Sequence, residues 1–221
     1  MVLREILKLL RRDNLQAQAL QECNEMLDVC QRMVLASIES LRRRDDATID
    51  IDILSLDKKL NSFERDVRRK VMTHLSLGHT SDISSGLVLV SIVIDIERIG
   101  DYSKNIYGLA RNHPERLHAG ELEQTLIQIE THALDHLART VKAFKSGDTD
   151  EARRLMHDYK GEISRLCAEL EETLVAEEVP LRPGQAATLA LYTRFLKRVS
   201  AHSRNLISSL VNPFDRLGYP E

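Results

Sequence analysis

The fold of this chain is decided by residues 97–106, Glu97-Arg98-Ile99-Gly100-Asp101-Tyr102-Ser103-Lys104-Asn105-Ile106. The stretch returns 100 positions later as Lys197-Arg198-Val199-Ser200-Ala201-His202-Ser203-Arg204-Asn205-Leu206. The arginine, the serine and the asparagine recur, and two isoleucines become valine and leucine. Self-similarity of this kind predicts two copies of one structural unit. The copies differ at the acids, since lysine and alanine replace Glu97 and Asp101.

The composition favours helices. The chain has 221 residues, of which 43% are hydrophobic and only 4% aromatic, with no Trp, nine Gly and five Pro. Leu, Ala, Arg and Glu are abundant, and these residues form helices readily. A chain of this length can bury a substantial core as one large or two small domains. The composition predicts an all-α protein.

Apolar residues recur every three or four positions in six segments, which is the period of an amphipathic helix. The segments cover residues 20–41, 49–75, the stretch from the turn at 76–81 to about 112, and then 122–144, 155–174 and 189–210. Each set of three is expected to form an antiparallel bundle. The prediction is two tandem three-helix bundles: residues 1–113 with the intact acidic motif, residues 118–213 with the degenerate copy, and a C-terminal tail at 214–221.

Charge and cysteine usage exclude some classes of protein. A formal net charge of −3 offers no basic field for a phosphate backbone, so no nucleic-acid partner is expected. The basic run 42–44 is followed at once by two aspartates and is interpreted as a helix end. Cys23, Cys30 and Cys167 form no CxxC motif and are expected to be small core residues in a reduced, cytoplasmic protein.

No segment is long and apolar enough to predict insertion into a membrane. The longest apolar run, 87–94, is far shorter than the roughly 20 residues that span a bilayer. Residues 1–12 lack the architecture of a signal peptide but have amphipathic helical spacing. They are expected to pack on their own bundle, with docking on a partner or a membrane surface as the alternative.

Most recognisable enzyme motifs are missing from the sequence, which has no Gly-rich phosphate loop, nucleophile elbow, zinc-finger spacing or paired Glu-x-x-His motif. No catalytic residue is therefore predicted. His132 and His136 lie four apart, near Glu130, and could bind a metal, although a solvated polar face is the alternative. The other histidines, including His74 and His79, form no further pair at helical spacing, and no metal site is predicted for them.

The strongest candidate site is the acid pair of the first repeat. Glu97 and Asp101 are four residues apart, so their carboxylates share one helix face and could hold iron or another divalent cation. Asp57 and Glu64, seven apart on the preceding helix, could supply further ligands. A competing apolar stripe over residues 92–110 would instead form the core and leave Glu97 and Asp101 solvated.

Residues 97–101, Glu-Arg-Ile-Gly-Asp, with Asn105-Ile106 following, resemble the signature of the PhoU family of phosphate-uptake regulators. The similarity extends from Asp57 to Asn112, and the duplicated three-helix plan fits the family over nearly the whole chain. In that family each bundle has two acids separated by three residues, from which multinuclear clusters of iron or other metals are built. The resemblance implies metal ligands at Glu97 and Asp101, with Glu64 as the acid from the neighbouring helix.

This sequence departs from the family pattern at several positions. Arg68 stands where a second acid would follow Glu64, and Ser164 stands 100 positions after Glu64. Lys197 and Ala201 replace both acids of the second motif. At most one intact metal site per chain is therefore expected.

The resemblance also implies a cytoplasmic, non-enzymatic and usually dimeric protein. Such a protein negatively regulates phosphate uptake and phosphate-starvation signalling between a phosphate transporter and a membrane sensor histidine kinase. Two alternatives stay open: an accessory module of another phosphate carrier, such as a sodium-coupled one, and a metal-dependent enzyme. Lys197, Arg198 and Arg204 are expected to give the second bundle a basic face suited to an acidic partner.

Overall fold

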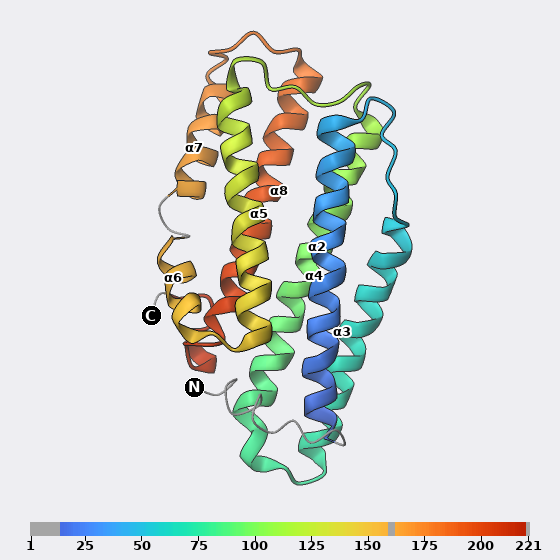
Figure 1. The fold of residues 1–221 in the computed structure, drawn as a ribbon, viewed down its shortest axis with the longest axis vertical. Coiled ribbons are helices and arrows are strands. Elements are labelled where there is room, and N and C mark those ends of the chain that lie inside the picture. Colours follow the sequence, from blue (N-terminus) through green and yellow to red (C-terminus); the bar gives the residue numbers. More distant parts are fainter. Residues whose placement is uncertain (1–13, 159–161, 220–221) are drawn as a thin grey trace.

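The computed structural model describes residues 14–158 and 162–219 (Figure 1). The amphipathic segment predicted at residues 1–12 lies outside these residues. Within them the secondary structure consists of α-helices and short 3₁₀ turns, and no strand occurs. The all-α prediction is confirmed.

The first bundle consists of three long helices. They are α2 (Leu15–Arg43), α3 (Ile53–Ser76) and α4 (Ile83–Asn112). The side chains of Asn14 and Asp52 cap the first two helices by accepting hydrogen bonds from backbone N–H groups of the first turn. These helices match the three that the apolar periodicity predicts.

The second bundle repeats this plan with one difference. It contains α5 (Glu123–Ser146), α6 (Thr149–Asp158), α7 (Glu162–Val175) and α8 (Pro183–Ser208). Gly147, with φ of 67°, ends α5 in the left-handed conformation that glycine adopts without strain. One helix was predicted over 155–174, whereas the structure describes two, α6 and α7, on either side of residues 159–161.

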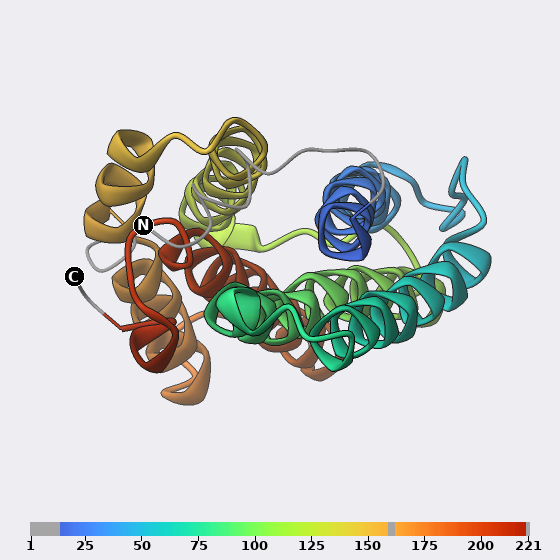
Figure 2. The same cartoon turned by 90° about the horizontal axis from the view of Figure 1, so that it is seen from below.

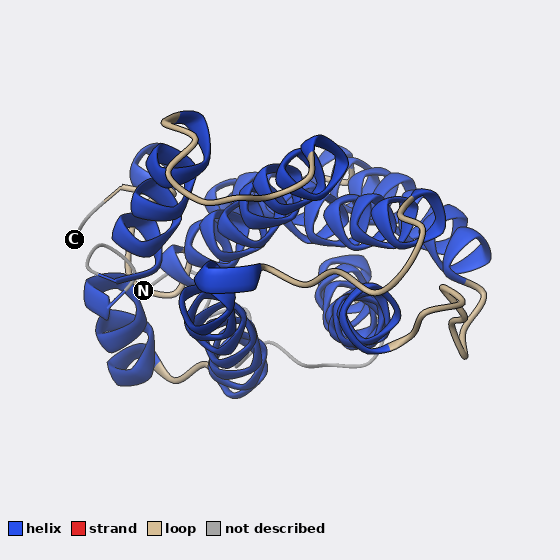
Figure 3. Cartoon of the chain, turned by 90° about the horizontal axis from the view of Figure 1, so that it is seen from above, coloured by secondary structure: helices blue, strands red, loops and turns tan. Residues whose placement is uncertain are grey.

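The two bundles lie side by side along α4 and α8. Seen from either end, α2 and α3 lie on one side and α5, α6 and α7 on the other (Figures 2 and 3). Helix α4 packs against α2, α3 and α8, while α5 packs against α8 and α2. The buried apolar side chains of all these helices form one continuous core. The prediction of two tandem three-helix bundles is confirmed, and the bundles share their core.

Individual core predictions can be checked against burial. Cys23, Cys30 and Cys167 are buried free thiols, as expected for core residues. The competing stripe on α4 is also buried throughout; its residues are Ile92, Ile96, Ile99, Ser103, Ile106 and Ala110. None of the helices in the described part of the chain is long and apolar enough to cross a membrane.

Candidate functional site

The four predicted acidic residues face each other across the α3–α4 contact. Asp57 and Glu64 lie on α3, and Glu97 and Asp101 lie on α4. Glu97 is only 8% exposed although the adjacent apolar stripe is also buried. The expectation that a buried stripe would leave the acids solvated is wrong for Glu97, because α4 is covered by three helices and has more than one buried face.

Gly100 sets the close approach of the two helices at this site. A Cβ at Gly100 would overlap Cδ1 of Leu60, which is itself buried. Leu60 lies on α3 between Asp57 and Glu64, just as Gly100 lies on α4 between Glu97 and Asp101. A close contact between the helices is therefore at the centre of the acid cluster.

Basic side chains neutralise the half of the cluster that contains Asp57 and Asp101. The Lys104 ammonium donates to Asp57 Oδ1 at 2.8 Å and to Asp101 Oδ1 at 3.1 Å. Arg98 donates from Nη1 to Asp101 Oδ2 at 2.8 Å. Lys104 thus bridges the two helices.

The other half, Glu64 and Glu97, is less well neutralised. Glu64 pairs with Arg68 at 2.8 Å on its own helix. The closest base to Glu97 among the described residues is Arg98, whose Nε lies 3.6 Å from Oε2. Burial, reinforced by the charge of Asp101 and opposed by that of Arg98, raises the pKa of Glu97 to about 7.

The chemistry of this cluster fits a hard cation. Carboxylate oxygens are the ligands that iron and other divalent cations accept, and a cation would relieve the cost of burying Glu97 among other acids. Lys104, Arg98 and Arg68 already offset part of that charge. In the described structure no three of these carboxylates converge within ligand distance of one another. A bound cation would therefore compete with the lysine that joins Asp57 to Asp101.

The raised pKa of Glu97 predicts a pH dependence of stability. A group that binds its proton more tightly when folded stabilises the fold at low pH. The free energy of unfolding should fall as pH rises through the window from 4.5 to about 7, by on the order of 1–2 kcal/mol because the carboxylate keeps some contact with water. Urea unfolding at pH values below and above this window measures the change in the free energy of unfolding.

The matched variants for this pH test are Glu97→Gln and Glu169→Gln. Glu97→Gln removes the titrating group and should flatten this part of the profile. Glu169 is exposed and pairs with Arg165 on its own helix, so Glu169→Gln should leave the profile unchanged. A wild-type profile that rises across the window would contradict the prediction.

The second copy of the motif has a different role. His202 Nδ1 lies 2.7 Å from Asp95 Oδ1, and Asn205 donates to the same oxygen at 3.1 Å. Arg198 donates from Nε to the Tyr102 hydroxyl at 3.2 Å. The degenerate motif on α8 thus packs against α4 and joins the bundles.

Two of the three side chains predicted to form a basic face on α8 have different neighbours. Lys197, Arg198 and Arg204 are all half-buried. Arg198 is turned towards α4, whereas Lys197 lies near Cys167 of α7. Arg198 thus has a neighbour on α4 and Lys197 one on α7. Residue spacing within α8 does not report these packing contacts between helices.

Arg42, interpreted as part of a helix end, is a buried link between the bundles. Its Nε donates to Glu130 Oε1 at 2.6 Å, and its other nitrogens contact Glu123 and the Leu117 carbonyl. The buried Tyr192 hydroxyl also donates to Glu130, at 2.8 Å. No spacing rule in the sequence could identify these partners, because they lie on different helices.

The predicted histidine pair, His132 and His136, lies on α5 with Glu130 nearby. Glu130 is bound by Arg42 and Tyr192. His132 lies 3.5 Å from Glu162 of α7, and His136 is buried. The pair is not part of a three-ligand group among the described residues.

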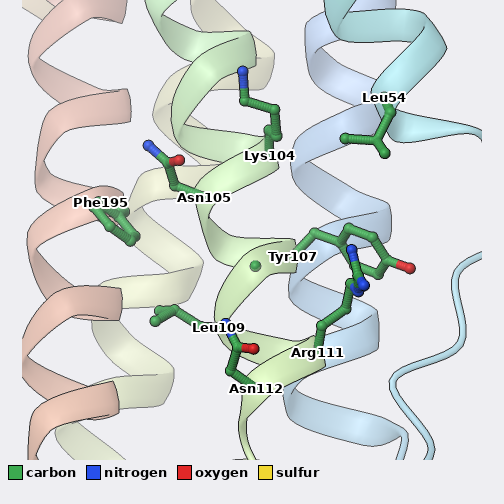
Figure 4. A pocket seen from close by; sticks show the side chains of 9 residues that line it. Leu54, Lys104, Asn105, Tyr107, Leu109, Arg111, Asn112 and Phe195 are labelled. Carbon is green, nitrogen blue, oxygen red and sulfur yellow. The ribbon is translucent and has the colours of Figure 1, made fainter.

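A hollow of about 390 Å³ borders the acid cluster on the side of α8. Figure 4 shows its lining side chains, which include Lys104, Asn105 and Arg111 of α4 and Phe195 of α8. None of the residues that line it is a carboxylate, a histidine or a cysteine. The acids therefore do not open into this hollow.

The chain matches a family model described as the PhoU domain twice, over residues 23–110 and 126–210. Among solved structures, the phosphate transport system regulatory protein PhoU from Streptococcus pneumoniae is 18% identical with a TM-score of 0.70, and the match covers 96% of this chain and 95% of that one. PhoU from Pseudomonas aeruginosa is 19% identical with a TM-score of 0.71, covering 88% and 94%. These likenesses show a shared fold. No match was found among curated proteins.

Proposed function

Because the chain belongs to the PhoU family, we propose that it regulates phosphate transport, lowering phosphate uptake and phosphate-starvation signalling when phosphate is plentiful. The observation that supports this proposal is the family match in both halves of the chain. The long helical faces suit contact with partner proteins rather than catalysis. The proposed partners are a phosphate transporter and a membrane sensor histidine kinase, contacted from the cytoplasm by a homodimer.

The acid cluster is the proposed regulatory element of the first bundle. Glu97 and Glu64 would hold iron or another divalent cation, with Asp101 and Asp57 as further ligands. A bound cation supplies positive charge and fixed oxygen coordination, which would hold α3 against α4. Without it, Lys104 performs part of this role through its bonds to Asp57 and Asp101. The site would be present once per chain, since Lys197 and Ala201 provide no carboxylate.

A phosphate-starvation reporter, measured at high phosphate, tests the function. Deletion of the gene should derepress the reporter, and the wild-type chain should restore repression. The Glu97→Gln/Asp101→Asn variant, if folded, should fail to restore it, because it removes two carboxylates from the cluster.

The control is Asp46→Asn/Asp50→Asn, which removes two exposed acids at the same spacing and should repress normally. A reporter that stays unchanged on deletion would overturn the regulatory proposal and favour an accessory role at another phosphate carrier. Normal repression by the Glu97→Gln/Asp101→Asn variant would show that regulation does not depend on the acid cluster.

A further inference from the structure

A second group of potential metal ligands lies at the turn between α3 and α4. His74, His79 and Asp82 each place one ligand atom within 4.8 Å of the others. His74 is 3% exposed, and its Nε2 lies 2.7 Å from Asp82 Oδ2. The imidazole rings of His74 and His79 are stacked with centroids 4.2 Å apart. Two imidazole rings and one carboxylate thus lie close enough together to form one set of potential ligands.

The backbone of this turn brings the three residues together. His74 is in the last turn of α3, and Gly78 follows the helix with φ of 94°, which favours glycine. The chain then forms the short 3₁₀ turn Thr80–Asp82, which leads into α4. The two histidines are five positions apart, so they would lie on different faces of a continuous helix. The helix ends between them, and this change of direction lets both rings lie near Asp82.

Asp82 provides independent support. It occupies the N-cap position of α4, where an aspartate side chain normally accepts a hydrogen bond from a backbone N–H of the first turn. Here the side chain makes no capping hydrogen bond. Its Oδ2 is directed to His74, while its backbone carbonyl accepts a hydrogen bond from Ser85. The Asp82 carboxylate therefore accepts no hydrogen bond from a backbone N–H of the first turn of α4, and it lies beside the histidine rings instead.

We propose that His74, His79 and Asp82 bind a transition-metal ion, with Zn²⁺ as the fitting species. Two imidazole nitrogens and one carboxylate oxygen suit a tetrahedral zinc ion, whose fourth position is open to water. His79 is exposed, so its ring can turn out of the stack and direct a nitrogen at the ion. Binding at His74 Nε2 would replace its hydrogen bond to Asp82 Oδ2 with a bond to the ion, and the neutral ring would then carry its proton on Nδ1. The ion would fasten the end of α3 to the start of α4.

This site is separate from the acid cluster. Asp82 and Glu97 are 15 positions apart in sequence, which is about 22 Å along a helix at 1.5 Å per residue. The donors differ too, since imidazole nitrogens favour zinc, whereas an all-carboxylate set favours harder cations. The proposal goes beyond the regulatory function and does not depend on it.

Cobalt(II) is the probe for the test, because tetrahedral Co²⁺ with nitrogen ligands absorbs visible light far more strongly than hexahydrated Co²⁺. The full chain is titrated with Co²⁺ in the wild type and in the Glu97→Gln/Asp101→Asn variant, which lacks the acid pair. Both should develop the tetrahedral band with one equivalent of Co²⁺, and one equivalent of Zn²⁺ should abolish it.

Variants of the ligands locate the site. His79→Gln should abolish the band with little effect on folding, because this side chain is exposed. Asp82→Asn should weaken Co²⁺ binding by more than the roughly 10- to 100-fold that the loss of an outer-shell partner costs. The matched control is His132→Gln, a half-buried histidine beside a carboxylate, which should keep the full band. A folded wild type without the band, a band that survives His79→Gln, or one that is lost in His132→Gln would each overturn the proposal.

Discussion

Replacing Arg42 by alanine is expected to destabilise the chain by about 3–5 kcal/mol, the cost of leaving a buried charge without its partner. The Arg42 side chain is almost fully buried and joins α2 to Glu123 and Glu130 of α5. Without it, the Tyr192 hydroxyl would be the remaining hydrogen-bond partner of the largely buried Glu130 within residues 14–158 and 162–219. The free energy of unfolding from urea titration measures the loss.

Two comparisons make the Arg42 prediction specific. Arg43→Ala removes the neighbouring charge, but this side chain is mostly exposed and pairs only within its own helix, so a change below about 1 kcal/mol is expected. Glu130→Gln in the Arg42→Ala background should recover part of the loss, because it removes the unpaired buried charge. Equal effects of the Arg42 and Arg43 substitutions would contradict the assignment of Arg42 as an inter-bundle link.

Gly100→Val is expected to cost about 2–3 kcal/mol through overpacking. The new Cβ would overlap Leu60 Cδ1, and Leu60 is too deeply buried to move aside without disturbing the core. Because this contact is at the centre of the acid cluster, the substitution should also move Glu97 and Asp101 away from α3. Urea unfolding measures the destabilisation, and the pH profile of stability reports on Glu97.

Gly108 on the same helix is the matched control for Gly100. A Cβ at Gly108 meets nothing within 4 Å, so Gly108→Val should change stability by less than about 0.5 kcal/mol. In a Leu60→Ala background, Gly100→Val should lose most of its cost, since the overlapping atom is gone. A cost that persists in that background would show that another contact, such as the one with Cys30, limits the site.

Much of the fold follows from residue spacing. The apolar periodicity predicts α2, α3, α4, α5 and α8, because a helix that must bury one face requires apolar residues every three or four positions. The repeat of residues 97–106 at 197–206 predicts the duplicated bundle. The same argument gave one helix over 155–174, where the structure describes α6 and α7.

Residue spacing predicts which acids share a helix face at the candidate site, but it does not predict the basic side chains that contact them. Four-residue spacing placed Glu97 and Asp101 on one face of α4, and seven-residue spacing placed Asp57 and Glu64 on one face of α3. The bridge by Lys104 and the weak neutralisation of Glu97 depend on how α3 packs against α4. The turn between α3 and α4 brought together His74, His79 and Asp82, which lie at the end of α3, in the turn and at the N-cap of α4.

The sequence by itself determined the helices, their duplication and the difference in acidity between the two motif copies, because these depend on residue type and on spacing within one helix. The tertiary structure decided which faces of α4 are buried, since this helix is enclosed by α2, α3 and α8. It also decided the partners of Arg42 and of Asp95, which lie on helices distant in sequence. Residue spacing determines which charged side chains are neighbours on one helix. Charged side chains on different helices become neighbours only when packing of the core sets how the helices lie against each other.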